Sequence, residues 1–496
     1  MQPNELAKLP EKIEALFIDM QNRIMLDVVR RIRKTGGITS TADYQLQKMQ
    51  ILGNSSEFLE AETKRLLNAT YPEVFELYDE VIEKDYVRDK SLYEQVNAKY
   101  IPYKDNETMQ AWVEAARVQT NGQFDNITKS MGFSLNYGNK LVFTPFSEYY
   151  QKYLDRACMD IVTGAFDYNS VLRRVVKEMT SSGIRTVDYA SGHSNRIDVA
   201  ARRAVMTGVN QLSAKIHERT AEDLGTDMYE VTWHTGARPS HWWGGRVYTK
   251  QELADICHLG EVTGLCGANC RHSYHAFIPG ISVRTYTDEQ LDQMNAKEVR
   301  VKEWKGKEYN VYQATQKQRQ METAMRAQRE KVQLLRSGRA DPDVVTVEKA
   351  KYQGQLNEYA RFCKIMDLKQ QRERIYIDLR GRVAPSKKTY VKYTSGNFKN
   401  TTKKSLQGQL SYVYNGVKDF IPTGTDFSNV KTIAGAGSDT PLRAAHRLAE
   451  KYGGASGEWS KFAGKIESGK YIFDVHWYER NGKQYDAKLK VRKGRQ

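Results

Sequence analysis

The chain has 496 residues, of which 76 are Lys or Arg and 60 are Asp or Glu, so its formal net charge is +16. This length predicts two to four domains rather than one. Apolar residues make up 40%, charged residues 27%, and only 11 residues are Pro. This composition favours long helices, and it excludes a collagen-like chain, a disulfide scaffold and a fully disordered protein.

Hydropathy and cysteine content narrow the class of protein further. We find no run of about 18 uncharged apolar residues, so we expect no membrane span. Charged residues from Glu5 to Glu14 interrupt the first twenty positions, which is not the pattern of a signal-peptide core. Five cysteines are few and odd in number, which favours folding in a reducing compartment.

The positive charge is concentrated at one end of the chain. Residues 381–496 contain 22 Lys or Arg and 9 Asp or Glu, a net of +13, which leaves only +3 for residues 1–380. A field of that size attracts nucleic acid or another polyanion. The alternative is a basic surface that only aids solubility.

Helical periodicity dominates residues 1–226. Apolar side chains recur at three- and four-residue steps, and Gly36-Gly37 end the first such run. The predicted helical stretches are 13–32, 58–67, 75–82, 109–118, 146–162, 168–179 and 197–224. We therefore expect a mainly α N-terminal body over 1–226.

The pattern changes at Asp227. Residues 228–233 alternate like a strand, 234–280 are rich in Gly, His and Cys, and 299–312 predict a short hairpin. Residues 227–312 should therefore form a small α+β segment. Residues 313–380 predict long polar helices interrupted near Ser337-Gly338. Their sparse apolar stripe suits either a helix hairpin lying on a partner or a solvated linker helix.

The last quarter of the chain predicts a linker and a separate domain. Residues 381–420 are rich in Ser, Thr, Lys and Gly, which is typical of a linker. Residues 421–496 should form a small, basic α+β domain, with a helix over 440–452 and strands over 471–476 and 485–491. Asn481-Gly482 between those strands is a strong hairpin signal.

Cysteine and histidine gather in one short window. Three of the five Cys and five of the nine His lie between His234 and His275. Cys266 and Cys270 bracket a turn-forming Gly267-Ala268-Asn269, and His272 follows two residues later. On a strand, Cys270 and His272 would face the same side.

This spacing predicts a structural zinc site. Zinc takes four nitrogen or sulfur ligands in a tetrahedron. Cys266, Cys270 and His272 would supply three, and His241 or Cys257 the fourth. Three alternatives remain: a Gly-rich turn without metal, a catalytic zinc ion, and a His–Asn–His nuclease site formed by His241, Asn269 and His272.

The same window resembles the signature of the phage minor capsid protein 2 family. The resemblance comprises His234 with Gly236-Ala237-Arg238-Pro239, then His241, then Trp243-x-Gly245-x-Val247-Tyr248, then the run from Gly264 to Ser273. Gly244 stands where the family commonly has Gln. The predicted helical residues 196–234 and the residues from 284 onward also resemble this family. The resemblance therefore covers roughly residues 1–380.

This resemblance implies a tailed-phage head protein related to the Mu-type head-morphogenesis proteins. Such a protein would be made in the host bacterial cytoplasm and would reside in the virion, in few copies, inside the capsid or at the portal. Its implied partners are the portal and major capsid proteins, together with packaged DNA at the basic C-terminal region.

Family members often carry a variable C-terminal module, sometimes similar to a toxin or a small nuclease. A metal-independent ribonuclease needs a general acid and base together with a cation for the phosphate. His446, Lys465, His476 and Lys488 are the candidates here. The alternative is a basic β module that binds packaged DNA or a capsid partner and catalyses nothing.

Overall fold

The computed structural model describes residues 1–38, 40–137, 140–187, 192–267, 270–394, 404–405, 410–414, 417–421, 426–468 and 471–492. They fall into two compact units, one of residues 1–163 with 172–384 and one of residues 164–171 with 385–496. The first is mainly helical with small sheets, and the second is a small α+β unit, which confirms the expected fold class. Among the described helices, none is long and apolar enough to cross a membrane.

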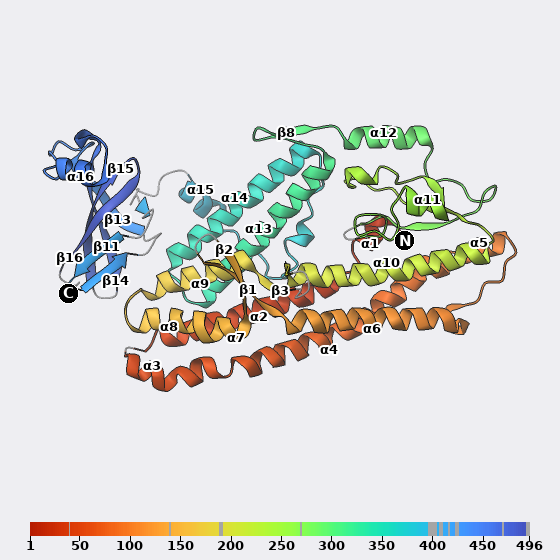
Figure 1. The fold of residues 1–496 in the computed structure, drawn as a ribbon, viewed down its shortest axis with the longest axis horizontal. Helices are drawn as coiled ribbons and strands as arrows, with labels where there is room; N and C mark the ends of the chain where they lie inside the picture. Colours follow the sequence, from red (N-terminus) through yellow and green to blue (C-terminus); the bar gives the residue numbers. More distant parts are fainter. Residues whose placement is uncertain are drawn as a thin grey trace. The chain divides into compact units, whose positions relative to one another are not determined.

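Four long helices form the frame of the first unit and lie side by side (Figure 1). They are α2 (Glu11–Thr35), α4 (Ser55–Val81), α6 (Glu107–Lys129) and α10 (Ile197–Asp223). Their apolar stripes meet in the interior, where Phe17, Val74, Val113 and Val209 are fully buried. The predicted helical periodicity is therefore confirmed, although α6 is about twice as long as the stretch that predicted it.

Shorter elements complete the bundle. The helices are α1 (Pro3–Leu6), α3 (Thr41–Lys48), α5 (Lys90–Gln95), α7 (Phe146–Glu148), α8 (Asp155–Val162) and α9 (Tyr168–Ser182). The π-helical turns η1 (Met49–Gly53), η2 (Ile82–Val87) and η4 (Tyr149–Leu154) extend or join them, as does the 3-10 turn η3 (Tyr103–Asp105).

A four-stranded sheet interrupts the helical body, which the sequence reading did not predict. Its order is β2-β1-β3-β4, with β1 (Met131–Tyr137), β2 (Lys140–Pro145), β3 (Ile184–Val187) and β4 (Ser194–Arg196). All pairs are antiparallel. β1 and β3 follow helices directly, and β3 and β4 have only four and three residues, so the period-2 pattern is brief compared with the helical pattern around it.

Two polar helices form a hairpin, as the break near Ser337-Gly338 predicted. They are α13 (Val311–Ser337) and α14 (Pro342–Met366). The sparse stripe of α13 is buried at Met325, Val332 and Leu335, and α13 packs on both α14 and α2. The partner of this hairpin thus includes the chain's own bundle.

The Gly/Cys/His-rich segment is built around a three-stranded sheet of order β6-β5-β7. Its elements are β5 (Met228–Val231), the 3-10 turn η5 (Pro239–His241), β6 (Val247–Thr249), α11 (Lys250–Asp255) and β7 (Tyr274–Phe277). Strand β7 packs against α10. Then come α12 (Asp288–Glu298) and the predicted hairpin, observed as β8 (Lys302–Trp304) and β9 (Lys307–Tyr309).

The second unit contains a five-stranded antiparallel sheet of order β10-β13-β14-β15-β16. Its strands are β10 (Lys404–Ser405), β13 (Asp426–Gly435), β14 (Ser460–Ser468), β15 (Tyr471–Arg480) and β16 (Lys483–Arg492). Helix α16 (Ala445–Tyr452) and the turn η7 (Ser456–Glu458) lie between β13 and β14. The predicted Asn481-Gly482 turn is present, with both residues at positive φ. Phe427, Val475 and Trp477 form the core of the second unit's sheet.

Residues 381–420, predicted as a linker, contain regular structure. They include α15 (Lys387–Thr394), β10, β11 (Leu410–Tyr414) and most of β12 (Val417–Ile421), which pairs with β11. The Ser, Thr and Gly content of this stretch suggested a linker, whereas Tyr412, Val413 and Tyr414 are residue types that are common in strands.

A buried ionic network ties η2 to α10. Asp85 and His217 are almost fully buried, and Asp85 Oδ1 lies 3.6 Å from His217 Nε2. Asp89 lies 3.7 Å from His217 Nδ1, while Ser213 and the amino group of Met1 donate to Asp85. Burial alone would lower the pKa of His217, but the two aspartates outweigh it and raise the pKa to about 9.

This network predicts a loss of stability at alkaline pH. A raised folded-state pKa gives stabilisation that is complete below the ordinary value of 6.5 and is lost as the pH rises to about 9. Between pH 7 and 9 the wild type should lose more than about 1 kcal/mol of unfolding free energy that His217→Gln does not lose. Denaturant titrations at several pH values measure this. His446→Gln, which alters an exposed histidine, is the control, and parallel pH profiles for wild type and His217→Gln would refute the prediction.

Candidate metal centre

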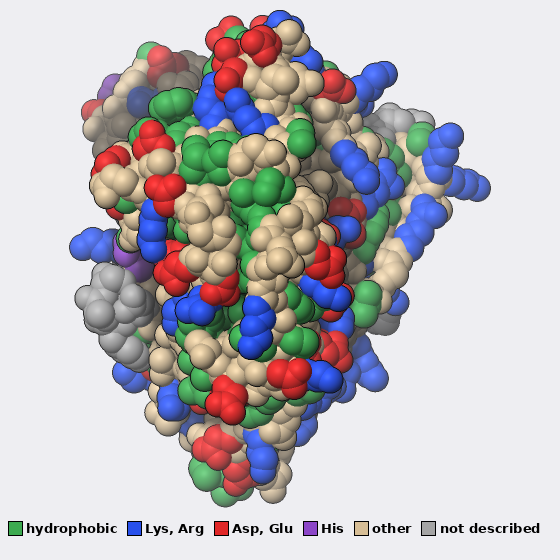
Figure 2. Space-filling model, turned by 90° about the vertical axis from the view of Figure 1, so that its right-hand side faces the viewer, with side chains coloured by type: hydrophobic (Ala, Val, Ile, Leu, Met, Phe, Trp, Pro, Cys, Tyr) green, Lys and Arg blue, Asp and Glu red, His purple; other side chains and the backbone are tan. Residues whose placement is uncertain are grey.

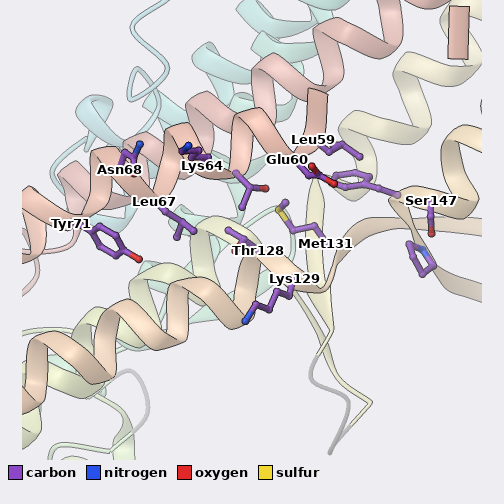
Figure 3. Close-up of a pocket in the computed structure, with 13 residues that line it drawn as sticks. Leu59, Glu60, Lys64, Leu67, Asn68, Tyr71, Thr128, Lys129, Met131 and Ser147 are labelled. Atoms are coloured by element: carbon purple, nitrogen blue, oxygen red, sulfur yellow. The ribbon is translucent and has the colours of Figure 1, made fainter. Parts of the chain in front are cut away.

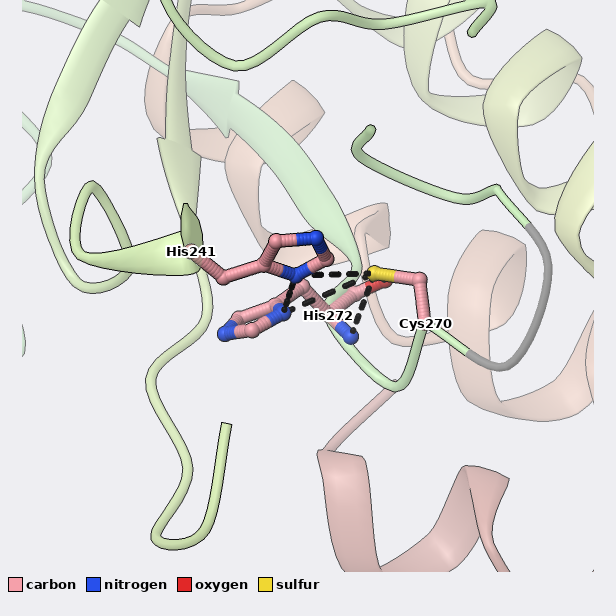
Figure 4. A group of neighbouring side chains, drawn as sticks. All are labelled: His241, Cys270 and His272. Carbon is pink, nitrogen blue, oxygen red and sulfur yellow. Dashed lines mark hydrogen bonds between the residues drawn. The ribbon is translucent and has the colours of Figure 1, made fainter. Parts of the chain in front are cut away.

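Three buried side chains converge at the end of the β6-β5-β7 sheet: His241, Cys270 and His272 (Figure 4). His241 closes the turn η5, whereas Cys270 and His272 lie in the extended segment that leads into β7. The predicted strand does not include these two positions, because β7 begins only at Tyr274. Their side chains nevertheless meet, with Cys270 Sγ 3.5 Å from His272 Nδ1.

The donor atoms are spaced like the corners of a tetrahedral zinc site. His241 Nδ1 lies 3.3 Å from His272 Nδ1 and 3.8 Å from Cys270 Sγ. Bonds of about 2.05 Å to nitrogen and 2.3 Å to sulfur place two nitrogens about 3.3 Å apart, and a nitrogen and a sulfur about 3.6 Å apart. The spacing of the three donors is therefore compatible with a tetrahedral metal ion.

Hydrogen bonds orient the groups toward this point. His241 Nε2 donates to the carbonyl of Thr263 at 2.9 Å, which leaves the lone pair of its Nδ1 directed at Cys270 and His272. The backbone N–H of His272 donates to Cys270 Sγ at 3.4 Å, an interaction that favours a thiolate. His272 Nε2 has no hydrogen-bond partner among the described residues.

The electrostatic environment keeps both imidazoles neutral, the form that binds metals. Burial lowers the pKa of His241 and lowers that of His272 well below its ordinary value, with further lowering of His272 by His234, His241 and Arg271. Burial raises the pKa of the Cys270 thiol. Metal binding must therefore displace a proton from sulfur.

Two predicted ligands lie outside this group. Neither Cys257 nor Cys266, both described in the structure, is among the mutually close donors. Cys257 is fully buried in the apolar core with Tyr248 and Leu253, and burial raises its pKa to about 12. The Cys266 thiol points to the carbonyl of His272 at 3.7 Å. Asn269, required for a His–Asn–His site, lies outside the described residues.

The loop before Cys270 depends on glycine. A Cβ at Gly264 would lie 1.9 Å from the carbonyl oxygen of His258, so no other residue fits that position without moving the backbone. The close approach brings Thr263 to the position where its carbonyl accepts from His241.

Aromatic rings surround the cluster, and sequence reasoning did not assign them a role. The Trp243 ring stacks on the His241 ring with 4.6 Å between the ring centroids. The ring centroids of His234 and His272 are 4.3 Å apart. Burial, and next the charge of Arg271, lowers the pKa of His234 to about 4. The clustering of five histidines was the signal available in sequence, but it could not separate His234 from the ligand candidates.

A separate groove of about 540 Å³ lies between α4, the end of α6 and residues 145–147 (Figure 3). Leu59, Leu67 and Tyr71 line it from α4, and Thr128 and Met131 from the opposite side. The described residues that line it include no histidine or cysteine and a single carboxylate, that of Glu60. It is therefore no candidate for metal binding or paired acid–base chemistry.

The sheet of the second unit brings the positions of three of the four nuclease candidates into register. His476 on β15 is registered opposite Ala463 on β14 and Lys488 on β16, and Lys465 is two residues from Ala463. His476 and Lys465 therefore lie on the same face. The side chain of Lys488 lies outside the described residues. His446 is 83% exposed on α16 and lies 3.6 Å from Glu450.

Comparison with known proteins identifies the family. The model of the family described as Phage minor capsid protein 2 matches residues 1–361. The chain therefore belongs to the phage minor capsid protein 2 family, a family of virion components. No curated protein and no solved structure matches the chain.

Proposed function

We propose that this protein is a low-copy structural component of the phage head, held by its helical body at the portal or the inner capsid surface, with its C-terminal sheet on packaged DNA. The family match over residues 1–361 is the observation that carries the structural role. The division of charge, +3 over 1–380 and +13 over 381–496, supports protein contacts for the body and DNA contacts for the tail.

The surface of the body suits protein partners. On the face in the middle of Figure 2, Lys and Arg side chains lie beside Asp and Glu side chains, with hydrophobic side chains between them. A mixed surface of this kind attracts no polyanion by charge alone, whereas it offers the polar and apolar groups of a protein interface.

Cross-linking of purified heads tests the placement. We expect peptides of this chain in intact heads, and cross-links from residues 1–384 to the portal or the major capsid protein, detected by mass spectrometry. Cross-links to the tail proteins only, or absence of the chain from purified heads, would contradict the proposal. Heads that lack DNA serve as the control, because contacts of the body should persist in them.

The metal that fits the cluster best is zinc, in a structural role. One thiolate and two imidazoles are ligands that zinc prefers, and the site is buried under Trp243 rather than open to substrate. The described residues supply three ligands at this point, so the fourth position is left to water or to a group that moves on binding. When bound, zinc would join η5 to the segment before β7, two parts of a module with a small apolar core.

Metal analysis tests the site. Wild-type protein should contain about one zinc ion per chain, and Cys270→Ser should contain less than about 0.3, because the thiolate is the strongest donor. Cys257→Ala provides the matched control, since Cys257 lies in the apolar core of the same module. Equal zinc in the wild type and Cys270→Ser, or no zinc in either, would rule the site out.

The DNA-binding surface that we propose is the face of the C-terminal sheet opposite its core. Lys461 and Lys465 on β14 share this face with Asp474, His476 and Tyr478 on β15, and Asp474 lies opposite Lys465. Trp477 points into the core. The amino group of Lys461 lies 5.9 Å from the ring centroid of Tyr478. Rows of lysines on a sheet match the phosphates of a nucleic-acid backbone without reading its sequence.

Substitution of two lysines tests this face. Lys461→Gln with Lys465→Gln should weaken binding to duplex DNA about tenfold and reduce the dependence of log K on log salt by about 1.8, since each lost phosphate contact removes about 0.9. Lys302→Gln with Lys307→Gln, which changes two exposed lysines of the β8–β9 hairpin, is the control. If both double variants bind duplex DNA with the same affinity, this face does not contribute to DNA binding.

The second candidate function is a nuclease effector. The shared face of Lys465 and His476, with Lys488 in register opposite His476, favours it. The binding assay separates the two functions when the nucleic acid is also examined for breakage. Cleavage of RNA or DNA that is lost in His476→Ala would establish the nuclease. Binding without cleavage supports the structural role.

A further inference from the structure

A trough of about 650 Å³ lies along the seam between α6 and α10, two helices that pack side by side (Figure 1). One end of the trough rests on β3 and β4 of the four-stranded sheet. The lining includes Gln123, Asn126 and Lys129 on α6, Arg203 and Thr207 on α10, and Asn195 on β4. Among the described residues that line the trough, none carries a carboxylate.

The two cations of the lining lie at the end of the trough next to the sheet. Helix α6 ends where the sheet begins and α10 starts where it ends, so the two helices run in opposite directions. At the far end, the side chain of Gln119 donates to that of Gln211 at 3.0 Å and bridges the helices. At a rise of about 1.5 Å per residue, Lys129 and Arg203 lie about 15 Å and about 12 Å from this bridge along their helices.

Neither cation has a partner within the described chain. The side chains of Lys129 and Arg203 are exposed and form no hydrogen bond or ion pair with any described residue. Asp125 precedes Lys129 by one helical turn without forming an ion pair with it, whereas the turns on either side of Arg203 contain no carboxylate. The carboxylate of Asp198 is buried in ion pairs of its own. The charge of Arg203 is therefore available to a ligand.

The neutral part of the lining has free hydrogen-bonding groups as well. The amide side chains of Gln123, Asn126 and Asn195 form no hydrogen bond with described residues. Each of these amides can both donate and accept. Ala200 and Ala204 are small, so they leave room between the walls. Such a lining suits a peptide backbone, which presents one N–H and one C=O at almost every residue.

We propose that this trough binds a short extended segment of a partner protein, with an acidic residue at the end where Arg203 and Lys129 lie. A length of about 15 Å accommodates about four to five residues in extended conformation. The carboxylate of the segment would pair with the cations, and its backbone would pair with the free amides. This proposal rests on the proposed role of the helical body in contacts with other head proteins.

The position of the cations favours a peptide over a nucleic acid. A nucleic-acid strand carries a phosphate at every nucleotide, so it requires cations along the whole trough. Here both cations lie at one end, and the remaining polar side chains are neutral. A phosphate backbone also has no donor for the amide oxygens, whereas a peptide supplies one at almost every residue.

Photo-cross-linking of the full chain tests the trough with synthetic peptides. The probe is a capped six-residue peptide of serines with a central diazirine and one glutamate at either end, and its counterpart has lysine in place of glutamate. In the wild type, the glutamate peptide should cross-link to residues 119–130 and 195–207 at least about fivefold more than the lysine peptide. Mass spectrometry measures this at equal ionic strength, and cross-links to the basic residues 381–496 serve as the internal reference.

Reversal of one charge provides the matched comparison. Arg203→Glu should reduce cross-linking of the glutamate peptide in the trough about fivefold and leave the reference cross-links unchanged. Lys215→Glu, which reverses an exposed lysine of the same helix outside the trough, should behave like the wild type. If Arg203→Glu fails to fold, the neutral Arg203→Gln should still lose about half of the cross-links.

Three results would overturn the proposal: equal cross-linking of the two peptides in the trough, undiminished cross-linking in the Arg203 variants, or displacement of the glutamate peptide by oligothymidylate as efficiently as by the unlabelled peptide. The last result would assign the trough to nucleic acid. Because these measurements use the purified chain, their failure leaves the placement in heads untouched. Absence of the chain from purified heads would contradict that placement without changing the peptide cross-links.

Discussion

The arrangement of the first unit depends on α10, which is buried on two opposite sides. The helix packs against α2 and α6 on the bundle side and against β7 of the central module. Val205, Val209 and Ile216 are fully buried along it. A Cβ at Gly208 would lie 2.0 Å from the hydroxyl of Tyr78, so glycine lets the Tyr78–Thr120 hydrogen bond lie directly against the helix. A helix buried in this way cannot rotate or shift without disturbing both layers.

Contacts with α10 set the position of the candidate metal centre. Asn210 donates to the carbonyl of Cys266, and Tyr274 donates to Glu218, so α10 holds both ends of the segment that carries Cys270 and His272. The third candidate ligand, His241, comes from η5, which lies between β5 and β6 in the chain. Its position is set by Thr263 and by the stacked Trp243. A bound ion would thus connect a segment anchored to α10 with the turn η5.

The sequence predicted the long elements better than the short ones. The periodicity of α2, α10 and the α13–α14 hairpin extends over many turns, so its signal accumulates. Strands β3 and β4 span four and three residues, too few for alternation to be recognised. Within the Cys/His window, spacing alone could not show that Cys257 lies in an apolar core.

The net charge of +16 hides two different arrangements of cations. In the first unit several buried cations are paired with carboxylates inside the structure, as in Arg329–Asp378 and Arg326–Asp198. This pairing agrees with the net charge of only +3 over residues 1–380. In the second unit Lys461 and Lys465 are spread along a sheet face where water and salt screen them. The first arrangement leaves little charge for a polyanion, whereas the second suits an extended polyanion, so the two regions would respond differently to salt.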